Sequence, residues 1–152
     1  MSYIPFPNIS PEIFSVTIGG VTLALRWYAL GYIAGLLAGW KLIEVMLARP
    51  ALWAGPAPMP REAAERLLTW VIIGVILGGR MGYVLFYQPS AFLQNPASIF
   101  FIWQGGMAFH GGFLGVVVAG LWFARAAGVP ALTLGDLMAA VAPIGIFLVR
   151  IA

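Results

Sequence analysis

The chain contains one histidine, His110, which lies in the glycine-rich apolar segment GGMAFHGGFLG at positions 105–115. A polar side chain in such surroundings typically faces a cavity or a partner, because hydrocarbon penalises unpaired polar groups. The neighbouring glycines, Gly111, Gly112 and Gly115, leave room around the ring for a ligand. A core histidine bonded to a backbone carbonyl is the competing interpretation. The glycines favour a functional role for His110.

Arg80, Arg150 and Tyr28 are the other candidates for chemistry. Each arginine lies in an apolar run, where a guanidinium costs on the order of 3 kcal/mol by insertion scales. Two such cations with no carboxylate close by indicate an anionic partner supplied from elsewhere. Phosphate is the natural candidate, because the guanidinium fork matches it with two parallel hydrogen bonds. Together with His110, these side chains predict a polar pocket that binds a phosphate group.

Composition defines the environment of this pocket. The chain has 152 residues, of which 62% are hydrophobic and 9% charged, and its mean hydropathy is +0.97. A soluble domain of this size cannot bury so much apolar surface, so the solvent must be lipid. The chain has no cysteine, which excludes disulfides and thiolate metal sites. The net charge of +3 is too small and scattered to indicate nucleic-acid binding.

Four apolar segments are long enough to cross the hydrocarbon core of a bilayer as helices. The sequence therefore predicts a single all-α domain, a polytopic membrane helix bundle, with a short extramembrane lead-in over residues 1–20. The expected spans are 21–47, 67–87, 99–124 and 132–152.

The loops predict the orientation of the bundle. The segment 88–98 carries no charge, whereas the first and third loops and their borders are basic. Their cations are Lys41, Arg49, Arg61, Arg66 and Arg125. By the positive-inside rule these two loops lie in the cytoplasm and the N-terminus lies outside. Arg80, His110, Arg150 and Tyr28 then all fall in the outer half of the membrane, with His110 near the middle of its span.

Small residues recur at every fourth position along three spans and predict closely packed helices. They are Gly31, Gly35 and Gly39, then Gly74, Gly78 and Gly82, then Gly111, Gly115 and Ala119. Two other features have structural interpretations. Lys41 and Glu44 are spaced as a helical ion pair, and Asp136 is placed to stabilise the N-terminus of the fourth span.

The segment 105–115 resembles the HGG-(L/F)-(I/L)-G signature of bacterial prolipoprotein diacylglyceryl transferases. Three other segments agree with that family in order and spacing. They are RWYALGY at 26–32, GGRMGYVLFY at 78–87, and GD at 135–136 followed by APIG at 142–145 and Arg150. The resemblance covers nearly the whole chain and implies a multi-pass protein of the bacterial cytoplasmic (inner) membrane.

The resemblance implies a specific reaction. A diacylglyceryl group moves from phosphatidylglycerol to the lipobox cysteine thiol in the signal peptide of a preprolipoprotein. A thioether forms and glycerol-1-phosphate leaves, in the first step of lipoprotein maturation. The nucleophile belongs to the substrate, so the protein needs none of its own. The expected partners are phosphatidylglycerol, that signal peptide and membrane lipid, without nucleic acid, metal or other cofactor.

Matched position by position, the resemblance implies that Arg150 is catalytic and binds the phosphate of the phospholipid. It makes His110 and Tyr28 catalytic as well, Arg80 a second phospholipid-binding residue, and Asp136 a supporting residue. Gly111, Gly112 and Gly115 are supporting residues of the histidine motif. Whether His110 is a general base or orients the lipid stays open. A thiol beside cationic arginines ionises more readily, so a weak base can suffice.

Two departures from the family pattern accompany the resemblance. Val149 stands where a glycine is expected, and the sequence ends at Ala152, where the family continues with further polar segments and spans. We therefore expect the chain to be the N-terminal part of a longer enzyme and to be inactive alone. The alternatives are a truncated, inactive homologue and a small membrane transport or scaffold subunit.

Overall fold

The computed structural model describes residues 9–19, 21–101 and 105–152, and the chain is mostly helical. Its four long helices are each long and apolar enough to cross a membrane. These are α1 (Trp27–Leu47), α2 (Ala63–Phe86), α4 (Phe109–Ala127) and α5 (Ala131–Ile151). The predicted all-α bundle with four spanning helices is thereby confirmed, and the chain is a multi-pass membrane protein.

Short elements connect and precede these helices. An antiparallel hairpin of two strands leads directly into α1, and Arg26 at its end pairs with Glu12 at 3.3 Å. The short elements are β1 (Glu12–Ile18), β2 (Val21–Arg26), the 3-10 turns η1 (Pro50–Leu52) and η2 (Pro96–Phe100), and α3 (Pro89–Gln94). The hairpin is the one departure from an all-helical chain in the described part.

Two predicted spans begin too early. Residues 21–26 form a strand, so α1 begins at Trp27 instead of residue 21. The alternating sequence VTLALR suits a half-buried strand better than a helix. The third helix begins at Phe109 instead of residue 99, since η2 and two glycines of positive φ precede it. The second helix begins at Ala63, four residues before the predicted start at residue 67. The fourth helix agrees with its predicted span within one residue. Residues 1–8 and 20 of the expected lead-in lie outside the described residues.

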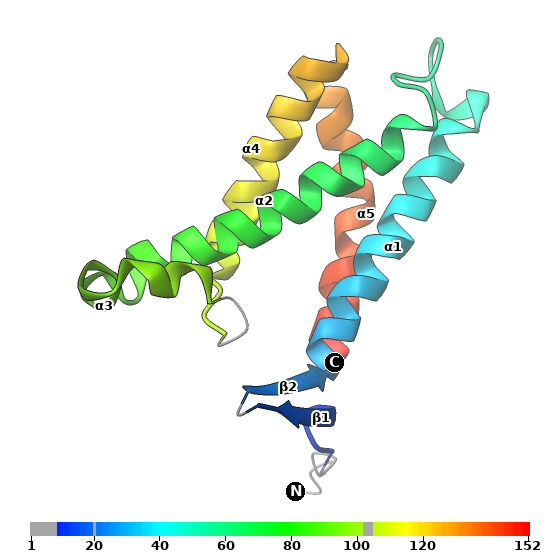
Figure 1. Ribbon diagram of the computed structural model, residues 1–152. Coiled ribbons are helices and arrows are strands. Elements are labelled where there is room, and N and C mark those ends of the chain that lie inside the picture. The colour runs from blue at the N-terminus through cyan, green and yellow to red at the C-terminus, as the bar shows by residue number, and fades with distance from the viewer. Residues whose placement is uncertain (1–8, 20, 102–104) are drawn as a thin grey trace, which may run out of the picture.

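The four long helices form two antiparallel pairs, α1 with α5 and α2 with α4 (Figure 1). The glycine ridges predicted from sequence are the contact surfaces of both pairs. In the first pair, a Cβ added at Gly35 would lie 2.7 Å from the Cα of Gly145. In the second, a Cβ added at Gly82 would lie 2.7 Å from the Cα of Gly111. Backbones this close gain dispersion contacts that larger side chains would prevent.

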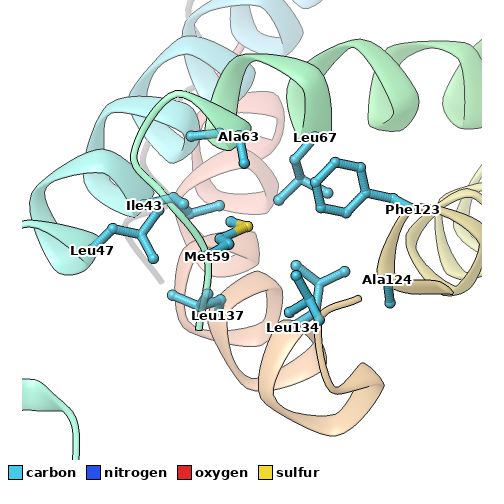
Figure 2. Packing of buried hydrophobic residues seen from close by; sticks show 11 residues of the cluster. Ile43, Leu47, Met59, Ala63, Leu67, Phe123, Ala124, Leu134 and Leu137 are labelled. Atoms are coloured by element: carbon cyan, nitrogen blue, oxygen red, sulfur yellow. The ribbon is translucent and has the colours of Figure 1, made fainter. Parts of the chain in front are cut away.

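The two pairs are joined at one end, which we call the core end. Here the buried apolar side chains of all four long helices meet around Met59 from the α1–α2 loop (Figure 2). Leu67, Leu134 and Leu137 are fully buried in this cluster. The other end carries the hairpin, α3 and the start of α4, and we call it the histidine end. Towards it, α2 leans away from α1 and α5 (Figure 1).

The predicted ion pair between Lys41 and Glu44 is confirmed at the core end. Lys41 Nζ lies 2.8 Å from Glu44 Oε2, and Arg61 Nη2 from the α1–α2 loop reaches the same oxygen at 3.4 Å. The loop is further held by Trp53 Nε1, which donates to the carbonyl oxygen of Met46 at 3.2 Å. These contacts fix the α1–α2 loop against the end of α1.

Gly111→Ala is expected to lower the free energy of unfolding by about 1–3 kcal/mol, the usual cost of overpacking. The added methyl would overlap the carbonyl oxygen of Gly78 and lie 2.7 Å from the Cα of Gly82. Gly112→Ala is the matched control, because its methyl would meet the carbonyl oxygen of Val75 at 3.7 Å, an ordinary contact. Circular dichroism during SDS titration in mixed micelles measures the difference. Equal midpoints for the two variants would contradict this account of the interface.

Candidate functional site

His110 is the second residue of α4 and is exposed. It borders a cavity of about 350 Å³ that is lined by Phe86, Tyr87, Ala108 and His110 itself. Its ring makes an edge-on contact with that of Phe109, with centroids 5.7 Å apart. The prediction that His110 lies near the middle of its span is wrong, because the helix begins one residue before it. The histidine therefore lies at the end of the α2–α4 pair where α4 begins.

Backbone contacts with α2 set where α4 begins. The amide of Ala108 donates to the carbonyl oxygen of Gly79 at 2.9 Å, and Gly112 donates to Ala108 at 2.9 Å in the first turn. A Cβ at Gly79 would lie 2.7 Å from the flexible end of Met107, so the glycine leaves room for that side chain beside this contact. The first turn of α4, with His110 in it, is thus fixed directly to the C-terminal half of α2.

Arg80 is the one buried charged side chain in the described part of the chain, with 6% of its surface exposed. All three guanidinium nitrogens donate to backbone carbonyl oxygens of the segment that precedes α4. Nε lies 2.8 Å from Ile99, Nη1 lies 2.7 Å from Gly105 and 3.0 Å from Gly106, and Nη2 lies 2.6 Å from Ser98. The structure thus directs Arg80 to the backbone, where the sequence suggested a phosphate.

Two of these acceptors depend on glycine. Gly105 and Gly106 have φ of +86° and +81°, in the left-handed region that other residues rarely adopt. A Cβ at Gly106 would also lie 2.5 Å from the Tyr83 ring. That ring stands 5.9 Å from the guanidinium carbon of Arg80, centroid to atom. The paired glycines of the histidine motif therefore turn their carbonyl groups towards α2.

Tyr28 and Arg150 belong to the other helix pair. Tyr28 is exposed in the first turn of α1, with its ring centroid 4.8 Å from that of Tyr32. Arg150 is exposed in the last turn of α5. A Cβ added at Gly31, one turn after Tyr28, would lie 3.2 Å from Ala152 Cβ. The antiparallel packing of α1 and α5 thus brings Tyr28 and Arg150 to the same end of this pair.

The candidates therefore fall into two groups at the histidine end. His110 and Arg80 belong to the α2–α4 pair, and Tyr28 and Arg150 to the α1–α5 pair. Convergence of all four on one phosphate stays a prediction. Asp136 is placed apart from both groups, because it is exposed near the start of α5 at the core end. Of the supporting glycines, Gly111 and Gly115 are contact residues of the α2–α4 interface, whereas Gly112 packs more loosely.

Sequence reasoning missed three residues that line the cavity. Phe86 and Tyr87 end α2, and Ala108 precedes α4. Tyr87 is an aromatic residue near the end of a span, which is typical of a residue at the membrane interface. Its position beside His110 is therefore not apparent from the sequence. No signal in the sequence pairs the end of α2 with the start of α4, because the spacing of the glycines does not tell which helices pack together. Within the described residues no cluster of three His, Asp or Glu side chains could hold a metal ion.

Comparison with known proteins identifies the family of the chain. The family model of prolipoprotein diacylglyceryl transferases matches residues 14–152. Two Cereibacter sphaeroides proteins named phosphatidylglycerol–prolipoprotein diacylglyceryl transferase are 60% and 58% identical over all 152 residues. A Roseobacter denitrificans protein of the same name is 55% identical over 150 residues. The chain spans 52%, 75% and 51% of the lengths of these three relatives. With nearly its whole length matched, the chain belongs to the prolipoprotein diacylglyceryl transferase family.

Proposed function

We propose that this chain takes part in diacylglyceryl transfer from phosphatidylglycerol to the lipobox cysteine of a prolipoprotein. The sulfur forms a bond to the terminal glyceryl carbon of the diacylglyceryl group, the bond from that carbon to the phosphate oxygen breaks, and glycerol-1-phosphate leaves. The thiol proton passes to a base or to the leaving phosphate. One observation carries the proposal: the single histidine of a chain in this family borders a cavity at the end of a helix pair.

We assign the thiol side of the reaction to His110. The cavity beside it is lined mainly by apolar side chains, Phe86, Tyr87 and Ala108, which suit the glyceryl and acyl parts of a lipid. An imidazole at this position can accept the thiol proton or hold the lipid by a hydrogen bond. The exposure of His110 at the start of α4 supports access for a substrate that arrives from the membrane.

The phosphate side belongs to Arg150 in this proposal, with Tyr28 at the same end of the α1–α5 pair. Arg150 is exposed, and a guanidinium can bind two phosphate oxygens at once. Arg80 is less suited to this task, because its nitrogens already donate to backbone carbonyl oxygens. Positive charge on Arg150 would stabilise the negative charge that develops on the departing glycerol-1-phosphate.

We also propose that the histidine end faces outward from the bacterial inner membrane. Support comes from the positive-inside rule. Arg49 and Arg61 lie in the α1–α2 loop at the core end, with Arg125 in the last turn of α4 at the same end. The loop at the opposite end, residues 88–98, carries no charge. An outward site would meet a prolipoprotein after its signal peptide has entered the membrane.

Transfer of labelled diacylglyceryl to a lipobox peptide tests the function and the orientation together. The enzyme is a chimaera in which residues 1–152 replace the matching part of the Cereibacter sphaeroides relative that is 60% identical. A membrane-impermeant peptide added outside the vesicles should be labelled by right-side-out vesicles. Inverted vesicles should not label it. A peptide with serine in place of cysteine is the control for the thiol. Absence of transfer in both vesicle types would contradict the proposed function, and transfer in inverted vesicles alone would reverse the orientation.

A further inference from the structure

We propose that Arg80 is a positioning residue, which holds the segment before α4 against α2 and so determines where His110 lies. This inference rests on the proposed function, since it gives His110 a part in the reaction. It assigns Arg80 no contact with the substrate.

The guanidinium joins two stretches of backbone. Its acceptors Ser98 and Ile99 belong to η2, whereas Gly105 and Gly106 lie just before α4. These four bonds are 2.6–3.0 Å long, and Nη2 also lies 3.5 Å from the carbonyl oxygen of Phe101. Only arginine offers donors in a rigid planar fork that can reach acceptors on several sides. A lysine ammonium is a single point and cannot span both stretches at these distances.

Carbonyl groups provide the main compensation for the charge of Arg80. The chain has five carboxylates, and Glu44, Glu62, Glu65 and Asp136 lie at the core end of the bundle. The fifth, Glu12, pairs with Arg26 in the hairpin. A buried cation without such compensation is costly, so the carbonyl groups around Arg80 are held in place as long as the guanidinium stays buried. The side chain therefore acts as a strong clamp on these two stretches.

The clamp continues into the first turn of α4. Gly79, the residue before Arg80, accepts the amide of Ala108 at 2.9 Å, and His110 follows two residues later. The side chain of Arg80 and the backbone of Gly79 thus both hold residues 105–108. Ala108 also lines the cavity beside His110. Release of the clamp would shift both the histidine and the wall of its cavity.

Arg80→Lys and Arg80→Gln test the clamp by hydrogen exchange and by kinetics. In lipid nanodiscs, amides of residues 105–112 should exchange about tenfold faster in both variants, as expected for the loss of a net hydrogen bond. In the chimaera, kcat for transfer should fall about 10–100-fold, since a displacement near 1 Å can cost that much. The KM for phosphatidylglycerol should stay within about twofold of the parent, because uniform substrate binding is unchanged. Lysine should not rescue the rate.

Gly105→Ala disturbs the same clamp from the acceptor side and leaves Arg80 intact. An alanine there has free space but a φ of +86°, so the turn must move. Gly128→Ala is the matched control, with a φ of +67°, free space and a place in the α4–α5 loop at the core end. Only Gly105→Ala should speed exchange of residues 105–112. This variant keeps the test informative if the Arg80 variants fail to fold.

Two outcomes would overturn the inference. One is unchanged exchange over residues 105–112 in a folded Arg80→Gln protein. The other is a raised KM for phosphatidylglycerol with normal exchange, which would make Arg80 a lipid ligand. Failure of the proposed function gives a different result, namely parental transfer by His110→Ala. In that case the exchange comparison of Gly105→Ala with Gly128→Ala still decides whether Arg80 holds the start of α4.

Discussion

Replacing His110 with glutamine is expected to lower kcat for diacylglyceryl transfer by about 10²–10⁴-fold, the range for loss of a positioned acid–base group. Glutamine has a similar reach and can form hydrogen bonds, but it cannot accept a proton. The exposed position of the ring beside its cavity means that the substitution removes little packing. The measurement is single-turnover transfer from labelled phosphatidylglycerol to a lipobox peptide by the chimaera in proteoliposomes.

Two further variants interpret this result. Phe113→Leu is the control, because Phe113 is exposed one turn further along α4 and lines no described cavity wall. Its rate should match the parent. His110→Ala separates the two roles of the histidine. A transfer rate that is retained in His110→Gln but lost in His110→Ala would identify a lipid-orienting hydrogen bond. Parental transfer by His110→Ala would rule out both roles.

Arg150→Ala should lower kcat/KM for phosphatidylglycerol by about 10²–10³-fold, comparable to removal of one electrostatic contact to a developing anion. The leaving glycerol-1-phosphate carries the charge that the guanidinium would neutralise, and the apolar surroundings strengthen this interaction. Arg150→Lys should recover part of the rate, because a point charge retains attraction but loses the two-bonded fork. Initial rates over a range of phosphatidylglycerol fractions in the vesicles provide the measurement.

Arg125→Ala is the matched control for this arginine. Both residues are exposed cations in the last turn of a long helix, but Arg125 lies at the core end. Lys41→Ala is a second control, since Lys41 is exposed and pairs with Glu44 at the same end. Neither change should alter transfer by more than about twofold, as is usual for surface substitutions away from a site. A loss in Arg125→Ala equal to that in Arg150→Ala would refute a local role for Arg150.

The sequence predicted the four helices well because each apolar run is long enough to cross the membrane. It misplaced the starts of two helices because hydropathy alone does not distinguish a helix from an apolar strand or turn. The alternation in residues 21–26 and the paired glycines Gly105 and Gly106 carried that information. Placing His110 near mid-membrane followed directly from the second of these errors.

The glycine ridges were visible in the sequence, but their pairing was not. A row of small residues fits any other flat helix face, so spacing cannot tell that α1 packs on α5 and α2 on α4. The same holds for Arg80. Its isolation from carboxylates is apparent from the sequence, whereas its carbonyl acceptors depend on the backbone angles at Gly105 and Gly106. In the α1–α5 pair, the α5 residues nearest the glycines of α1 are Val141, Gly145, Leu148 and Ala152, and Val149 is not among them.

The nested order of the helix pairs has a consequence for biosynthesis. The partner of the small-residue face of α1 emerges only with α5, about a hundred residues after α1 is complete. At ribosomal rates of roughly 5–20 residues per second, this delay is on the order of ten seconds. During this interval the small-residue face of α1 is open to lipid or to unrelated helices in the translocation channel. The α2–α4 unit is completed first, and α5 then docks on α1.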